Sequence, residues 1–208
     1  MSRRTLTNWL SLSGVIAVMV YFLHVYIGQM NYPGYDWMRQ AVSDLTAVDA
    51  PSYLIASRYT SIYGSLSCLC CIMLCILIQH TETKTFRLGI YLYTIMNWIS
   101  YVGYTLYPLS SSGYSGTFQD VMHFYVVTIS VVLLSIASMV LIFIGGIKNK
   151  RNRYIAIFAA IALACMFFGS AGVGFVPPGY FGLVERFSVF SVVIFTGILG
   201  IYGFSTSR

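Results

Sequence analysis

Long apolar stretches separated by short polar segments dominate the chain. A helix of about 20 apolar residues is long enough to cross the hydrocarbon core of a bilayer. Stretches of this length predict membrane spans at residues 9–28, 59–79, 88–109, 120–146, 154–176 and 187–204. The pattern therefore predicts an all-α, polytopic membrane protein in which residues 1–208 form a single domain, a bundle of six transmembrane helices.

The composition agrees with this prediction. Hydrophobic residues make up 58% of the chain, charged residues make up 9%, and the mean hydropathy is +0.77, whereas about a quarter of a soluble protein is charged. The lipid bilayer is thus the expected partner. The net charge of +6 does not indicate nucleic-acid binding, because the basic residues lie in short loops rather than on a basic soluble face. We expect the five cysteines to pack inside the spans rather than form disulfides; they are Cys68, Cys70, Cys71, Cys75 and Cys165.

Basic residues are unevenly divided between the loops. Nine of the twelve Lys and Arg residues lie in segments 2–8, 80–87, 147–153 and 205–208. Basic loops of membrane proteins face the cytoplasm. The distribution predicts a multi-pass protein of the cell membrane with both termini in the cytoplasm, and with loops 31–58, 110–119 and 177–186 outside.

The first outer loop is longer than a simple connection requires. Pro33-Gly34 is typical of a turn, and Asp36 can cap a helix. We therefore expect a short interfacial helix from Trp37 to about Leu45. Ser43-Asp44 lies near the end of this expected helix. Asp44 is therefore expected to cap the helix or to hold the loop in place, rather than to act in catalysis.

Polar residues recur at helical spacing inside two of the expected spans. Asn97 and Tyr101 lie on one face of the third span, and Gln119, Asp120 and His123 share an arc at the start of the fourth. Polar groups that face lipid are costly. These faces are therefore expected to point into the bundle.

Six ionisable residues from five separate segments lie within about two helical turns of the outer ends. They are His24, Arg58, Asp120, His123, Glu185 and Arg186. Isolated charges at this depth are unfavourable, so we expect them to meet in one pocket that opens outward. We also expect at least one contact between an arginine, Arg58 or Arg186, and a carboxylate, Asp120 or Glu185.

These residue types allow three functions. The first is non-catalytic binding of a lipid or small molecule at the outer side, in a sensor, accessory subunit or small transporter; candidate ligand-binding residues are His24, Arg39, Arg58, Asn97, Tyr101, Gln119 and Arg186. The second is a membrane-embedded hydrolase or transferase acting on a lipid-type substrate, with His123, Asp120 and Glu185 as catalytic candidates and His24, His123 and Asp120 as candidate metal ligands. The third is a haem protein with His24 and His123 as axial ligands. The sequence leaves the cofactor open.

The motifs carry a family resemblance. Pro33-Gly34, Ser43-Asp44-Leu45, the His123 that opens the fourth span, and Glu185-Arg186 before the sixth resemble a prokaryotic family of six-span membrane proteins, domain of unknown function 998 (DUF998). The resemblance extends over nearly the whole chain. It implies the six-span fold and the outer site, and it implies no reaction.

Overall fold

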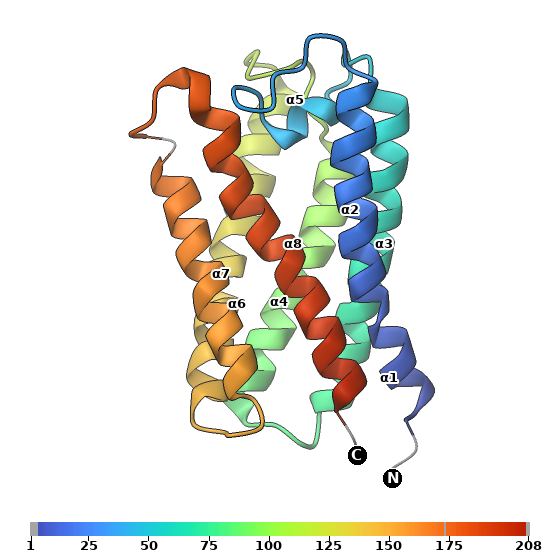
Figure 1. Ribbon diagram of the computed structural model, residues 1–208, viewed down its shortest axis with the longest axis vertical. Coiled ribbons are helices and arrows are strands. Elements are labelled where there is room, and N and C mark those ends of the chain that lie inside the picture. The colour runs from blue at the N-terminus through green and yellow to red at the C-terminus, as the bar shows by residue number, and fades with distance from the viewer. Residues whose placement is uncertain (1–3, 173, 207–208) are drawn as a thin grey trace.

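The computed structural model describes residues 4–172 and 174–206, and this part of the chain is helical, without strands (Figure 1). The all-α class expected from the sequence is confirmed. The long helices are α1 (Leu6–Ser11) with α2 (Ser13–Met30), α3 (Tyr53–Ile78), α4 (Lys84–Leu106), α5 (Phe118–Val121) with η2 (Met122–Thr128) and α6 (Ile129–Ile147), α7 (Arg153–Gly172) and α8 (Phe181–Ser205). Short 3-10 helices form at η1 (Val42–Thr46) and η3 (Pro178–Tyr180).

Five of the long helices are apolar and long enough to cross a membrane. They are Leu6–Met30, Tyr53–Ile78, Phe118–Ile147, Arg153–Ser170 and Pro178–Ser205. The expectation of an integral membrane protein with several apolar helices is therefore supported. The remaining long helix, α4, has 23 residues and a more polar sequence, which includes Thr94, Asn97 and several tyrosines.

The described ends of the chain lie at the same end of the bundle (Figure 1). We call this the terminal end, and it also carries the connections at residues 79–83 and 148–152. The opposite end, formed by residues 31–52, 107–117 and 174–180, is called the distal end. The segments that the sequence analysis placed outside the membrane thus gather at one end of the molecule.

The core fills the space between α3, α4, α6, α7 and α8. Its fully buried side chains include Leu74, Phe86, Tyr93, Phe195 and Tyr202. The buried Tyr93 hydroxyl is satisfied by hydrogen bonds, because it lies 2.7 Å from the Val192 carbonyl and 2.8 Å from Thr196 Oγ1. The five cysteines are free, as the sequence predicts, and Cys70 and Cys71 pack in this core.

A buried polar cluster joins three segments at the terminal end. Asn152 donates to one carboxylate oxygen of Glu82, and the Tyr202 hydroxyl donates to the other at 3.0 Å. The side chains of Asn152 and Tyr202 are at most 1% exposed. The cluster connects the α3–α4 turn, the α6–α7 turn and α8, and so holds the helices together at this end.

Two helices begin six residues earlier than the apolar pattern predicts. The second span was expected from residue 59 and the sixth from residue 187, but α3 begins at Tyr53 and α8 at Phe181. Both extensions contain charged residues, Arg58 in α3 and Glu185-Arg186 in α8. A helix can extend beyond its apolar stretch wherever its backbone N–H and C=O groups form hydrogen bonds.

The helix expected from Trp37 to about Leu45 is not formed. The chain makes a turn at residues 37–40 and then the 3-10 helix η1. The reason is tertiary, because the carbonyls of Trp37 and Gln40 accept hydrogen bonds from Arg186 of α8.

Residues 37–40 lie directly on the start of α8. The Leu183 N–H donates to the Met38 carbonyl at 3.0 Å, and a Cβ atom at Gly182 would lie 2.1 Å from the Gln40 carbonyl oxygen. Only glycine allows this approach of backbone to backbone.

We therefore predict that Gly182→Ala lowers the free energy of unfolding by about 1–3 kcal/mol, because overpacking against a backbone atom forces the loop away from α8. Gly179→Ala is the matched control, since a Cβ there meets no atom within 4 Å. Thermal unfolding of both purified variants in the same detergent checks the prediction. Equal midpoints for the two variants would contradict it.

Candidate functional site

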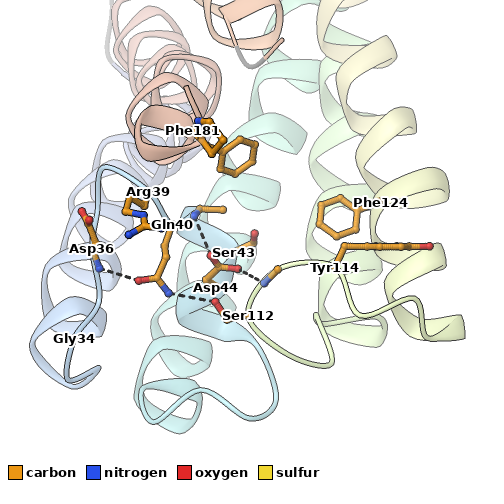
Figure 2. A pocket seen from close by; sticks show the side chains of 13 residues that line it. Gly34, Asp36, Arg39, Gln40, Ser43, Asp44, Ser112, Tyr114, Phe124 and Phe181 are labelled. Carbon is orange, nitrogen blue, oxygen red and sulfur yellow. Dashed lines mark hydrogen bonds between the residues drawn. The ribbon is translucent and has the colours of Figure 1, made fainter. Parts of the chain in front are cut away.

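A cleft of about 650 Å³ opens at the distal end (Figure 2). We call it the distal cleft. It is lined by residues of the first loop, of the second loop and of the starts of η2 and α8: Gly34, Asp36, Arg39, Gln40, Ala41, Ser43, Asp44, Ser112, Gly113, Tyr114, Phe124, Pro178 and Phe181. Four segments that are far apart in sequence thus contribute to one cavity.

The first loop forms the charged wall of the cleft. Gly34 turns the chain with a φ of +79°, and Asp36 Oδ1 accepts from the Met38 N–H at 3.0 Å. Gln40 closes this turn by accepting from the Asp36 N–H at 2.8 Å, and its amide donates to Ser112 Oγ at 3.2 Å (Figure 2). The expected capping role of Asp36 is therefore seen in a turn rather than in a helix.

Asp44 connects the first loop to the second. Its carboxylate accepts from the N–H of Ala41 at 3.0 Å and from the N–H of Gly113 at 3.0 Å (Figure 2). Burial raises the pKa of this carboxyl above its usual range, and the N–H groups of Gly113 and Ala41 oppose the rise. Both carboxylate oxygens accept hydrogen bonds from loop backbone, so Asp44 stabilises the two loops that line the cleft.

Aromatic side chains form the opposite wall. The rings of Tyr114 and Phe124 meet edge to face with centroids 5.7 Å apart, and Phe181 lies above Arg39 and Gln40 in Figure 2. Tyr114 is 55% exposed. The cleft therefore has charged groups and Phe181 on one side and the rings of Tyr114 and Phe124 on the other (Figure 2).

Arg186 lies beneath the cleft and fixes the first loop. Its side chain is 6% exposed, and its guanidinium donates to the carbonyls of Trp37 at 2.6 Å, Gln40 at 3.0 Å and Gly182 at 2.7 Å. A fourth bond of 2.7 Å reaches the Tyr35 hydroxyl. Burial raises the pKa of Tyr35 to about 12 despite the nearby Arg186. The phenol is therefore neutral, and it donates in turn to the Ala41 carbonyl at 2.7 Å.

Asp120 organises the second loop. Its buried carboxylate accepts from the N–H and hydroxyl of Ser110 at 2.9 Å and 2.8 Å, and from the N–H and hydroxyl of Ser115 at 3.0 Å and 2.5 Å. The neighbouring Gln119 donates to the Pro108 carbonyl at 2.5 Å. These contacts determine the shape of residues 108–117. Asp120 therefore faces the second loop and does not line the distal cleft.

His24 and His123 lie in different surroundings. Nδ1 of His24 is 3.2 Å from the Ala56 carbonyl, and its ring packs against Tyr21. Nδ1 of His123 is 2.8 Å from the Tyr107 carbonyl, and its ring packs against Tyr104 with centroids 4.7 Å apart. His123 lies in η2, a π-helical segment, and such segments are frequent at functional sites. Neither histidine lines the distal cleft.

The remaining candidates are also dispersed. Glu185 accepts a long bond of 3.4 Å from the Val42 N–H, Asn97 donates to the Tyr93 carbonyl of its own helix, and Tyr101 accepts from Ser65 Oγ at 3.1 Å. Arg58 lines a separate groove on α3.

The expectation that six ionisable residues line one pocket is therefore wrong in its choice of residues. Within the described chain, no salt bridge joins Arg58 or Arg186 to Asp120 or Glu185, since backbone groups satisfy Arg186 and the second loop satisfies Asp120. Backbone N–H and C=O groups take the place of the oppositely charged partners that we expected.

No group of three or more His, Cys, Asp or Glu side chains that could hold a metal ion occurs among the described residues. The set considered from the sequence, His24, His123 and Asp120, is thus not assembled as a cluster.

Comparison with known proteins identifies the family. A family model described as "Protein of unknown function (DUF998)" matches residues 15–202. The chain belongs to the DUF998 family. Comparison with curated proteins finds no match, and comparison with solved structures finds none either. The function of this DUF998 protein is therefore inferred from the site itself.

Of the residues singled out in the sequence, Gly34, Asp36, Arg39, Ser43 and Asp44 line the distal cleft of this DUF998 protein. Sequence reasoning missed Gln40 and the aromatic wall. The Gly113-Tyr114 and Pro178-Gly179-Tyr180 segments repeat the Pro-Gly-Tyr character of the first loop, and this repetition was the available signal for three loops that share a surface.

We predict that Asp120→Asn lowers the free energy of unfolding of this DUF998 protein by about 1–3 kcal/mol. The new amide must oppose the N–H of Ser110 or Ser115, which leaves a buried donor unsatisfied. Asp49→Asn, at an exposed loop position, is the control for the loss of one negative charge. The prediction fails if thermal unfolding midpoints of the two variants coincide.

Proposed function

We propose that the chain crosses the membrane six times, with the terminal end in the cytoplasm. The length of α4 supports the sixth span, because 23 residues extend about 35 Å at 1.5 Å per residue and the hydrocarbon core is about 30 Å thick. The basic residues support the orientation. Arg3 and Arg208 are outside the described residues, and seven of the other ten Lys and Arg residues lie at the terminal end. The distal cleft then faces the outside of the cell.

The orientation can be tested with introduced cysteines, because the native ones lie inside helices. A membrane-impermeant maleimide applied to intact cells is expected to label Ser112→Cys and Tyr180→Cys. Thr83→Cys and Lys150→Cys should react only after the cells are opened. Labelling of Lys150→Cys in intact cells would contradict the orientation.

We further propose that the distal cleft binds a small amphipathic ligand with an acidic group, in a protein that acts as a sensor, an accessory subunit or a small transporter. The observation that carries the proposal is the guanidinium of Arg39, which has no hydrogen-bond or ion-pair partner among the described residues. Its side chain is exposed in the cleft, whereas Asp44, Asp120 and Arg186 are held by loop atoms. A guanidinium binds carboxylate and phosphate groups well, and the aromatic wall suits an apolar ligand body.

Binding is favoured over catalysis by the same contacts. A hydrolase needs a nucleophile or a metal-bound water beside a general base, and the candidates His123, Asp120 and Glu185 do not line the cleft. The two histidines considered for haem pack against different helices. No observation supports the hydrolase, transferase or haem alternatives to the same degree.

Naphthalene-2-carboxylate is a suitable probe, because it combines an acid with an apolar ring. Its binding to the protein in nanodiscs can be measured by calorimetry, with empty nanodiscs as the blank. We expect Arg39→Gln to weaken binding by roughly twofold to fivefold, as an exposed charge pair contributes up to about 1 kcal/mol.

Two variants sharpen the test. Asp36→Asn should strengthen binding by a few fold, since it removes a negative charge beside Arg39 while the amide oxygen can still accept from Met38. Arg58→Gln, outside the cleft, should leave the affinity unchanged. Equal affinities for wild type, Arg39→Gln and Asp36→Asn would refute the proposed site.

A further inference from the structure

A shallow, open groove lies on the surface of α3 and is separate from the distal cleft. Its lining residues all come from the first three turns of α3: Tyr53, Leu54, Ser57, Arg58, Ser61 and Ile62. We call it the α3 groove. Leu54 is 72% exposed and Ile62 is 49% exposed. Because α3 is one of the apolar, membrane-length helices, this groove faces the lipid.

The depth of Arg58 in α3 is set by the sequence that follows it. From Tyr59 to Ile78, where α3 ends, there is no charged residue. These 20 residues extend about 30 Å at 1.5 Å per residue, which equals the thickness of the hydrocarbon core. Arg58 therefore lies at the boundary between the hydrocarbon and the headgroups, where lipid phosphates are found.

The Arg58 side chain has no partner among the residues that the structure describes. It is exposed, and in the described part of the chain it forms neither a hydrogen bond nor an ion pair. A charge at this depth requires a partner or water. The guanidinium fork matches a phosphate group in shape and charge, and the hydroxyl-bearing residues Ser57 and Ser61 lie beside it in the groove.

We propose that the α3 groove binds an anionic phospholipid of the leaflet that surrounds the distal end. Its phosphate contacts Arg58, and its acyl chains extend along the exposed face of α3 past Ile62 toward Ile72, which is 36% exposed. A headgroup with a net negative charge is preferred to a zwitterionic one, because none of the six lining residues is acidic and a headgroup amine would find no carboxylate among them.

The experiment uses the full chain in a neutral detergent. Phosphatidylglycerol is titrated and the midpoint of thermal unfolding is followed, while native mass spectrometry counts the bound lipids. For the wild type we expect a saturable rise of the midpoint with phosphatidylglycerol, a much smaller rise with phosphatidylcholine, and none with inorganic phosphate. Arg58→Gln should weaken the apparent affinity for phosphatidylglycerol about tenfold or more, because a charge-assisted contact is lost.

Two further variants keep the test decisive. Arg58→Lys retains the positive charge but lacks the forked guanidinium group, so an intermediate affinity is expected. This variant replaces Arg58→Gln in the test if Arg58→Gln does not fold. Arg39→Gln removes the same charge from the same end of the molecule but outside the groove, so it should retain the wild-type response to lipid.

Three results would overturn the proposal: an unchanged lipid affinity in both Arg58 variants, an equal loss in Arg39→Gln, or an equal effect of inorganic phosphate. None of them bears on the binding of naphthalene-2-carboxylate to the distal cleft, so the two proposals fail independently.

Discussion

The buried guanidinium of Arg186 is the constraint on which the distal end depends. It donates to three carbonyls and one phenol, and a hydrogen bond to a charged group contributes about 1.5–3 kcal/mol. Two of these carbonyls belong to the first loop. If the loop left α8, the guanidinium would keep only the Gly182 carbonyl among its described hydrogen-bond partners. Arg186 therefore fixes the path of residues 35–41.

Two other charged residues at this end are also held by loop atoms. Asp44 joins the first loop to the second, and Asp120 gives the second loop its shape. In each case backbone groups, joined at Asp120 by the hydroxyls of Ser110 and Ser115, satisfy the charged group, rather than a charge of opposite sign. Loops that are rich in backbone donors and acceptors can therefore hold several ionisable residues near a membrane without ion pairs. Arg39 and Arg58 differ from them, because they point out of the protein.

The fold was largely predictable because the hydrophobic effect and the thickness of the bilayer act on whole segments. Each expected span overlaps a long helix, and the expected inner and outer loops separate to opposite ends. The site was predictable only in part. Asp36, Arg39 and Asp44 were found because a long polar loop between apolar stretches is conspicuous. The partners of Arg186 and Asp120 were not predicted. The spacing of residues along a helix does not indicate whether a backbone carbonyl or N–H of a distant loop will contact a side chain. The rings of Phe124 and Phe181 are indistinguishable in the sequence from the many aromatic residues that face lipid or core.

The contact between α1 and α8 has a consequence for biosynthesis. The buried amide of Asn8 donates to the carbonyls of Gly203 and Thr206, both at 2.7 Å, across 195 and 198 residues of chain. Ser11 adds a bond of 3.2 Å to the Gly200 carbonyl. These acceptors do not exist while the ribosome is still producing the preceding helices. During that interval, water, lipid headgroups or the insertion machinery must solvate the polar face of α1, and the bundle closes only when its last helix arrives.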